Sequence, residues 1–333
     1  MNELIRRNTI YILLSIVILG SSCNKKQKEI SHMANTVLPK PILDTTVNLA
    51  GGKLYRIDSF PSKFVKPRTV EVWLPDGYSK DKKYAVLYMN DGQMLFDSTK
   101  TWNKQEWAVD ETLSRLMTTD SIKDVIVVAI WNIPEIRWQD YYPEKSWDFI
   151  PGDIQRQLIE EAKANAINVE FNADNYLKFI TEELKPLIDQ DYPVHTDTQH
   201  TIIAGSSMGG LISMYAVFER PEVFGGAICM STHWTGSVPP DPGEDNPMAK
   251  GFFDYMKSKN LDPKTHKIYF DYGTETLDAD YVQYASAVDE IFKEKGFDNS
   301  NYKNLKFEGD AHDEISWAKR LHIPIVFFLG KHE

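Results

Sequence analysis

The chain is organised around Thr201-Ile202-Ile203-Ala204-Gly205-Ser206-Ser207-Met208-Gly209-Gly210, where a strand pattern passes into a helix pattern. An apolar, β-branched run ends at Gly205, and helical periodicity follows Gly210. Between them lies G-x-S-x-G, which places Ser207 on a sharp strand-to-helix turn with its hydroxyl held clear of the sheet. The flanking glycines are required because a side chain there would collide with the neighbouring strand or helix. The helix N-terminus also favours negative charge at this point, so Ser207 is the candidate nucleophile.

The apolar pattern before and after this turn predicts an α/β fold. Continuous apolar runs at residues 84–89 and 124–130 are typical of central parallel strands, and alternating runs at 53–60 and 69–74 predict an opening hairpin or meander. Further strands are expected at 200–204, 225–230, 267–271 and 302–307, and helices at 106–117, 173–189, 208–219, 249–257, 279–295 and 312–329. Pro324 leaves the last boundary uncertain. The alternation implies a mostly parallel, doubly wound sheet flanked by helices.

Composition limits the function classes. With 333 residues, 42% of them hydrophobic, the chain can bury one large core, and we expect one catalytic domain over residues 42–333. The formal charge of −11 argues against nucleic acid or an anionic membrane surface as a partner, because either needs a basic face. No C-x-x-C or clustered Cys/His pattern suggests a metal site, and Cys229 is interpreted as a small buried hydrophobe.

The N-terminus has the pattern of a targeting segment. A positive region precedes an apolar run over residues 10–19 that is too short to span a bilayer comfortably. Small residues then lead into Cys23, as in a bacterial lipoprotein signal, which predicts a signal peptide over 1–22, lipidation of Cys23 and a flexible tether over 23–41. The alternative is an ordinary secretory signal with an incidental cysteine. We expect a lipid-anchored protein of the cell envelope, periplasmic or in the outer membrane.

The candidate base is found by elimination among eight histidines. In this fold the triad follows the chain order serine, acid, histidine. His312 comes directly after the last strand pattern and before a helix, where a triad histidine would return to the turn. His322 falls within a helical pattern and is interpreted as solvated. His233 follows the strand after Ser207 and, with Trp234, is expected to line the pocket.

The acid is expected on the loop after the strand at 267–271, where Glu275 and Asp278 are both candidates. Only one can hold the imidazole tautomer, and Asp278 has an alternative role as the cap of a helix beginning at Ala279. The oxyanion hole needs two N–H donors: one from Met208, the residue after the nucleophile, and one from the loop that follows residues 84–89, for which Gln93 is the candidate. The alternative for that loop is a simple Asp-Gly turn.

With these motifs in place, the sequence resembles the putative-esterase family of α/β-hydrolases, which includes feruloyl and acetyl-xylan esterases, S-formylglutathione hydrolase and enterochelin esterase. The resemblance is strongest at residues 87–97 and 205–210. It implies an α/β-hydrolase fold with Ser207 as nucleophile and His312 as base. The family's acid falls in the loop at residues 273–278, where Asp278 is favoured over Glu275.

An aromatic segment at residues 131–150 follows a central strand and so overhangs the same edge of the sheet as Ser207. It contains Trp131, Arg137 and Trp138, and relatives carry a similar Arg-x-x-Asp-Tyr-x-Pro element. Flat aromatics with polar neighbours suit a sugar or phenolic ring. They would serve equally well to pack the loop against the domain, and the sequence leaves both interpretations open.

These features predict a serine carboxylic-ester hydrolase that forms an acyl-enzyme and needs no metal or organic cofactor. The expected partner is a small-molecule or polysaccharide ester, with an acetyl or feruloyl ester of a carbohydrate favoured. The alternatives are a siderophore or other small ester, acyl transfer to an alcohol, and a non-catalytic glycan-binding lipoprotein on a hydrolase scaffold. The sequence does not give the oligomeric state.

Overall fold

The parallel strands predicted around Ser207 form the centre of one mixed sheet. The computed structural model describes residues 39–164, 168–236 and 245–331. Across these residues nine strands pair in the order β1-β2-β3-β5-β4-β6-β7-β8-β9. They are β1 (Ile42–Leu43), β2 (Lys53–Phe60), β3 (Arg68–Leu74), β4 (Ala85–Asn90), β5 (Val125–Ile130), β6 (Thr201–Ser206), β7 (Gly226–Met230), β8 (Lys267–Tyr272) and β9 (Tyr302–Lys306). The pairs from β1 to β5 are antiparallel, and all pairs from β5 to β9 are parallel.

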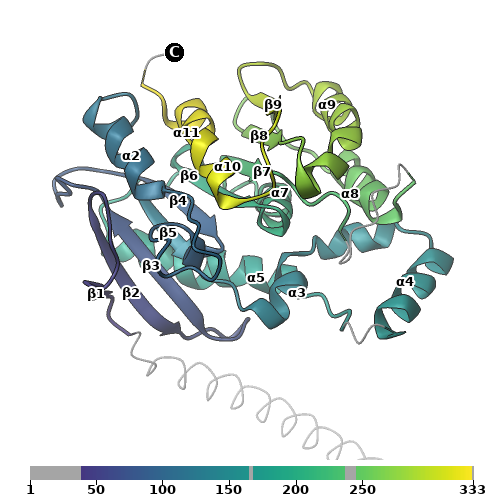
Figure 1. Ribbon diagram of the computed structural model, residues 1–333, viewed down its shortest axis with the longest axis horizontal. Helices are drawn as coiled ribbons and strands as arrows, with labels where there is room; N and C mark the ends of the chain where they lie inside the picture. Colours follow the sequence, from purple (N-terminus) through teal and green to yellow (C-terminus); the bar gives the residue numbers. More distant parts are fainter. Residues whose placement is uncertain (1–38, 165–167, 237–244, 332–333) are drawn as a thin grey trace, which may run out of the picture. The chain divides into compact units, whose positions relative to one another are not determined.

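Helices cover both faces of this sheet, as Figure 1 shows. They are α2 (Val109–Thr118), α3 (Arg137–Tyr141), α4 (Gly152–Ala164), α5 (Ala173–Lys178), α6 (Lys185–Asp191), α7 (Met208–Glu219), α8 (Pro247–Ser258), α9 (Ala285–Glu294), α10 (Glu314–Arg320) and α11 (His322–Leu329). Alternate residues of β4 enter different cores: Val86 and Tyr88 pack with α5 to α9, whereas Leu87 and Met89 pack with α2, α10 and α11. A strand buried on both faces must be apolar throughout, which explains the continuous runs in the sequence.

Two expected helices are divided. The helix predicted over 173–189 consists of α5, a π-type segment at Phe179–Leu184 and α6, and Pro186 in the first turn of α6 has no N–H to continue the regular ladder. The helix predicted over 312–329 divides at Leu321, between α10 and α11. Pro324 therefore lies in the first turn of α11, where a missing N–H removes no intrahelical bond.

A third expectation is wrong in its boundary. The α-helix predicted to begin at residue 279 begins at Ala285, and residues 276–284 form 3-10 turns instead. Thr276 has φ of +53°, which an α-helix cannot contain, and the Asp278 side chain bonds neighbouring loops instead of capping a helix. This departure brings Asp278 into the site.

The signal peptide predicted over 1–22, Cys23 and nearly all of the tether lie outside the described residues. Among the helices that the structure does describe, none is long and apolar enough to cross a membrane. Cys229 is buried in β7, as its surroundings in the sequence predicted.

Candidate active site

Ser207 stands at the turn between β6 and α7, at the edge where the parallel strands have their carboxyl ends. Its backbone has φ of +56° and ψ of −124°, a conformation that L-residues rarely adopt. Two hydrogen bonds hold the turn: the Ser207 N–H donates to the Met230 carbonyl at 3.0 Å, and the Ser207 carbonyl accepts from the His233 N–H at 3.2 Å. The candidate nucleophile is therefore held in place from the end of the neighbouring strand β7.

The glycines of the motif have the steric role expected from the sequence. A Cβ added to Gly205 would lie 2.6 Å from the carbonyl carbon and oxygen of Gly209. A Cβ on Gly209 would lie 3.0 Å from the Asp91 carboxylate, and one on Gly210 would lie 2.9 Å from the Thr232 hydroxyl. The turn can therefore close only with hydrogen at Gly205, and the loop after β4 packs directly against it.

His312 and Asp278 meet beside this turn. The His312 Nδ1 lies 2.6 Å from the Asp278 Oδ1, which leaves Nε2 as the ring nitrogen for proton transfer. The His312 N–H donates to the Thr276 hydroxyl at 2.8 Å, which ties the candidate base to the loop that carries Asp278. Of the two carboxylates that the sequence left open, Asp278 is fully buried and bonded to the histidine, whereas Glu275 is exposed.

The environment of Asp278 keeps its carboxylate ionised. Its Oδ2 accepts hydrogen bonds from the Ser231 hydroxyl and the Gly273 N–H, both at 2.6 Å. Burial alone would raise the pKa of Asp278, but the bond to His312, its charge, and the bonds from Ser231 and Gly273 together lower this pKa. The acid therefore stays negative and can stabilise an imidazolium at His312.

A buried arginine, Arg320, is linked to the candidate acid Asp278 through a shared hydrogen-bond partner. The Arg320 guanidinium donates to both carboxylate oxygens of Asp271, at 2.9 and 3.1 Å, and to Asp310 at 3.2 Å. It also donates to the Ser231 hydroxyl at 2.8 Å, the same hydroxyl that bonds Asp278. We call Ser231, Asp271, Asp278, Asp310 and Arg320 the acid-side network.

The oxyanion-hole candidates flank the turn. Met208 is the first residue of α7 and Gln93 the second of a 3-10 turn at Gly92–Met94, and such positions have no intrahelical acceptor for their N–H groups. A Cβ on Gly92 would lie 2.8 Å from the carbonyl carbon of Ala129, so this loop approaches β5 closely. The Gln93 side-chain oxygen accepts from the Asn132 N–H at 3.2 Å, which ties the loop to the segment after β5.

Hydrogen bonds and an ion pair to other loops hold the segment after β5 in place. The Arg137 guanidinium binds the Asp91 carboxylate through two bonds, of 2.8 and 2.7 Å, and Asn132 donates to the same carboxylate at 2.6 Å. The Trp138 indole N–H donates to the Gly236 carbonyl at 2.9 Å. We call Asp91, Gln93, Asn132 and Arg137 the oxyanion-side network. For Arg137 and Trp138, the structure shows the packing role that the sequence had left open beside substrate binding.

Trp234 and Trp131, two of the remaining aromatic candidates, differ in whether a ligand in a cavity could contact them. Trp234 is 5% exposed and packs against Phe253 and Phe270, so its ring belongs to the core instead of lining an open pocket. Trp131 lines a cavity of about 300 Å³ together with Gln93. Its indole N–H donates to the buried Glu71 carboxylate at 2.9 Å. Trp131 therefore remains the aromatic candidate for substrate contact.

Tyr281 is a site residue that the sequence did not reveal. Its hydroxyl lies 2.6 Å from the His233 Nδ1. Its ring lies edge-on to the ring of His312 at a centroid distance of 5.7 Å. The helical pattern expected from residue 279 hid this residue, and its spacing of three from Asp278 was the available signal.

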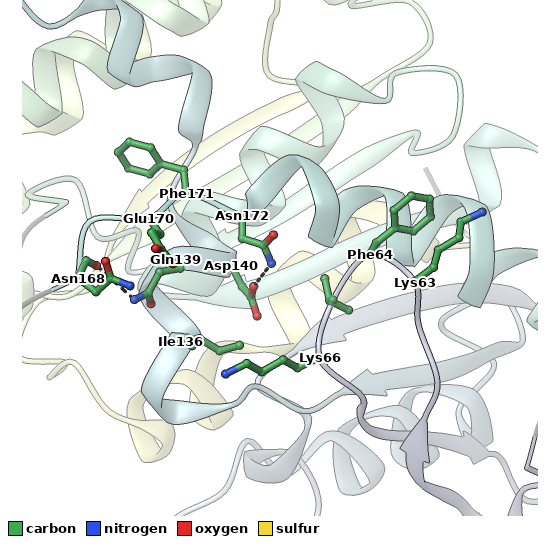
Figure 2. Close-up of a pocket in the computed structure, with 11 residues that line it drawn as sticks. Lys63, Phe64, Lys66, Ile136, Gln139, Asp140, Asn168, Glu170, Phe171 and Asn172 are labelled. Carbon is green, nitrogen blue, oxygen red and sulfur yellow. Dashed lines mark hydrogen bonds between the residues drawn. The ribbon is translucent and has the colours of Figure 1, made fainter. Parts of the chain in front are cut away.

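Another cavity, of about 530 Å³, lies elsewhere. Figure 2 shows its walls, which include Phe64, Gln139 and Asn172, and no residue of the candidate triad lines it. A third cluster, not anticipated from the sequence, brings His195, Asp197 and His200 together before β6, at the opposite edge of the sheet from Ser207. There the His200 Nδ1 is bonded to Asp197 at 2.7 Å, and Asp197 also accepts from the His200 N–H.

Known proteins share this sequence pattern and fold. The model of the putative esterase family matches residues 62–325. The chain is 25% identical over 284 residues to an endo-1,4-beta-xylanase/feruloyl esterase of Xylanibacter ruminicola, covering 81% of this chain and 30% of that protein. It is 32% identical over 153 residues to the ferri-bacillibactin esterase of Bacillus subtilis, covering 45% of this chain and 49% of that protein. The chain thus spans less than half the length of either relative.

Solved structures show the same architecture. A ferulic acid esterase of Anaeromyces mucronatus has a TM-score of 0.55 at 18% identity, covering 87% of this chain and 94% of that one. The enterobactin esterase of Shigella flexneri has a TM-score of 0.56 at 16% identity, covering 86% and 62%. At these identities the likeness shows a shared α/β-hydrolase fold.

Proposed function

The chain belongs to the putative esterase family, and we propose that it is a carboxylic ester hydrolase whose triad is Ser207, His312 and Asp278. The observation that carries this proposal is the 2.6 Å bond between the His312 Nδ1 and the buried Asp278, beside the strained turn that presents Ser207. A carboxylate in this place selects the tautomer whose Nε2 accepts a proton.

In the proposed acylation, the Ser207 hydroxyl attacks the ester carbonyl while its proton passes to the His312 Nε2. The carbonyl electron pair moves to oxygen, where the N–H groups of Met208 and Gln93 stabilise the charge. Collapse of this intermediate breaks the bond to the alcohol, which leaves with the proton from His312. Water then attacks the acyl-enzyme with His312 as base, and the acid is released.

The substrate that we propose is an acetyl or feruloyl ester of a carbohydrate. The cavity of about 300 Å³ that Trp131 and Gln93 share supports this, because it gives an aromatic wall beside the proposed oxyanion hole. The feruloyl esterase among the relatives supports it too, whereas the siderophore esterases favour a catecholate ester as the second candidate. We further propose that Cys23 carries a lipid that tethers the enzyme to the cell envelope, from the sequence pattern alone.

The test compares Ser207→Ala with Ser206→Ala, its neighbour in the same turn, in hydrolysis of p-nitrophenyl acetate and in labelling by a fluorophosphonate. We expect Ser207→Ala to lose about 10⁴-fold or more in kcat and all labelling. Ser206→Ala should keep both. Equal rates in Ser207→Ala and wild type would refute the triad. Methyl ferulate, acetylated xylan and a catecholate trilactone, offered to the wild type, then rank the substrate classes.

A further inference from the structure

A cluster of two histidines and an aspartate lies before β6, apart from the candidate triad. His195, Asp197 and His200 each offer one ligand atom, and these three atoms lie within 4.8 Å of one another. We propose that this cluster binds one divalent transition-metal ion such as Zn²⁺. The site would be additional to the proposed esterase site and does not depend on the role of any triad residue.

The chemistry of the three side chains selects the class of ion. Two imidazole nitrogens and one carboxylate oxygen are ligands that Zn²⁺ binds, with bonds of about 2.0–2.2 Å. Ca²⁺ and Mg²⁺ prefer ligand sets made of oxygen, which this cluster does not offer. Three protein ligands leave the fourth position of a tetrahedral ion to water. The cluster therefore favours Zn²⁺, or a related ion such as Ni²⁺ or Cu²⁺, over Ca²⁺ and Mg²⁺.

The side chains need only small movements to reach one ion. Two ligand atoms on a tetrahedral ion lie about 3.4 Å apart when each bond is about 2.1 Å long. The atoms of the cluster, which are up to 4.8 Å apart, therefore have to approach by at most about 1.4 Å. The His200 Nδ1 and the Asp197 Oδ1, 2.7 Å apart, would separate slightly instead. Both histidines are half-buried and Asp197 is exposed, so side-chain rotation suffices.

The two imidazole rings already lie side by side. The rings of His195 and His200 stack with their centroids 4.2 Å apart and their planes at 22°. The His200 ring is bonded to Asp197, whereas within the described part of the chain no hydrogen bond or ion pair engages the His195 ring. An imidazole without a polar partner thus stands next to a second imidazole and a carboxylate. A bound ion would give all three groups a common partner.

Hydrogen bonds hold the backbone of the cluster in this arrangement. The His195 N–H donates to the Tyr84 carbonyl, just before β4, at 2.9 Å. The Thr201 hydroxyl donates to the Asp197 carbonyl at 2.9 Å. The Asp197 side chain also accepts from the His200 N–H at 3.2 Å, as the cap of a 3-10 turn. Because the backbone is held without an ion, binding has little conformational entropy to remove.

The place of the cluster in the fold gives the ion a structural role. The cluster precedes β6 and Ser207 follows it, so a strand of six residues lies between the ion and the candidate triad. At about 3.3 Å per residue this is roughly 20 Å, which is too far for contact with the reacting atoms. An ion that binds the folded chain and not the unfolded one stabilises the fold by mass action.

The first test is calorimetric titration of the full chain with ZnCl₂, after a chelator has removed any metal. We expect the wild type to bind one equivalent more than His195→Ala or His200→Ala. His322→Ala removes an exposed histidine of α11 and is the matched control, which should bind as the wild type does. Equal binding by the wild type and both cluster variants would overturn the proposal. Equally strong binding of CaCl₂ at the cluster would overturn the assigned class of ion.

The second test separates coordination from a general change in the fold. Asp197→Asn keeps the shape of the acid and removes its charge, so we expect the Kd for Zn²⁺ to rise by at least about 10- to 100-fold, as it does when the partners of metal ligands are lost. The visible spectrum of bound Co²⁺, which reports the ligand set, should change in the same variant. Zn²⁺ should raise the Tm of the wild type and of His322→Ala, but not that of His195→Ala. A rise in Tm of the same size in His195→Ala, or an unchanged Kd in Asp197→Asn, would overturn the proposal.

Discussion

The two networks beside Ser207 each contain an arginine bound to carboxylate groups, but the two arginines differ in how deeply they are buried. Arg320, in the acid-side network, has a side chain that is 1% exposed and makes ion pairs with Asp271 and Asp310. Arg137, in the oxyanion-side network, is 27% exposed and binds Asp91 alone through two parallel bonds. The first network is buried in the core, whereas the arginine of the second is partly exposed to solvent.

The comparison shows that the role of an ion pair depends on which residues lie at the other end of its hydrogen-bond chain. From Arg320, the chain passes through the Ser231 hydroxyl to Asp278 and then to His312, so it ends on a proposed reacting group. From Arg137, the chain passes through Asp91, and Asn132 joins that carboxylate to Gln93. The acid-side network thus holds the negative charge of Asp278 beside His312. The oxyanion-side network instead holds the loop that carries Gln93 in place.

The largest predicted effect is the loss of kcat when the negative charge of Asp278 is removed. Asp278→Asn keeps the shape of the acid but offers His312 the wrong hydrogen-bonding group, so we expect kcat to fall about 10⁴-fold. Glu275→Gln, on the exposed part of the same loop, should keep wild-type kcat. Steady-state hydrolysis of p-nitrophenyl acetate measures both. A large loss in Glu275→Gln with little in Asp278→Asn would reverse the assignment of the acid.

The next effect concerns stability. Arg320→Met leaves buried aspartates without their partner, and we expect the free energy of unfolding to fall by about 3–5 kcal/mol. Arg137→Met breaks a pair that water can reach, and we expect a loss of about 1–2 kcal/mol. Urea unfolding of the two variants at pH 7 measures the difference. Equal losses would show that the contrast in burial between the two networks has no energetic meaning.

A further effect on stability is a pH dependence from a carboxyl group next to the oxyanion-side network. Burial, opposed by the bond from Trp131 and the charge of Arg56, raises the pKa of Glu71 from 4.5 to about 7. Between these values the unfolded chain releases the proton while the folded protein keeps it, so stability falls as pH rises. Asp278, with its lowered pKa, behaves oppositely: its contribution is present above the unfolded pKa and is lost as pH falls through the folded one.

Glu71→Gln removes the first of these two dependences. Between pH 4.5 and 7.5 the wild type should lose about 2–3 kcal/mol of stability relative to this variant. Urea unfolding of both proteins at the two pH values isolates Glu71, because all other groups contribute equally to both. Parallel pH curves for the two proteins would mean that Glu71 ionises normally in the fold.

The parts of the fold that the sequence predicted are those with local causes. Residues 84–89 and 124–130 were recognisable as central strands because burial on both faces requires an unbroken apolar run. The strand-to-helix turn at Ser207 was recognisable because it needs glycines at fixed positions. The choice of His312 as base uses the chain order of the fold and stays a prediction. The strands and the turn were thus predicted from information within a short stretch of chain.

What the sequence could not decide depends on contacts between distant segments. Asp278 and Glu275 lie on one loop, and the choice is made by His312, 34 residues later. Tyr281 was hidden because residues 279–284 carry a helical pattern, whereas bonds from Asp278 to other loops hold them in 3-10 turns. The role of Trp138 was open for the same reason, since its partner, the Gly236 carbonyl, is remote in sequence.

The strained backbone of Ser207 is one of four such positions at this edge of the sheet. Asp91, Ser231 and Thr276, on the loops after β4, β7 and β8, also have positive φ, of 57°, 44° and 53°. Each such residue costs about 1–2 kcal/mol, so the loops are held against their own preference by the sheet. A substitution that adds strain to these loops draws on the stability that the core supplies, so variants with a stabilised core should tolerate more changes in the loops.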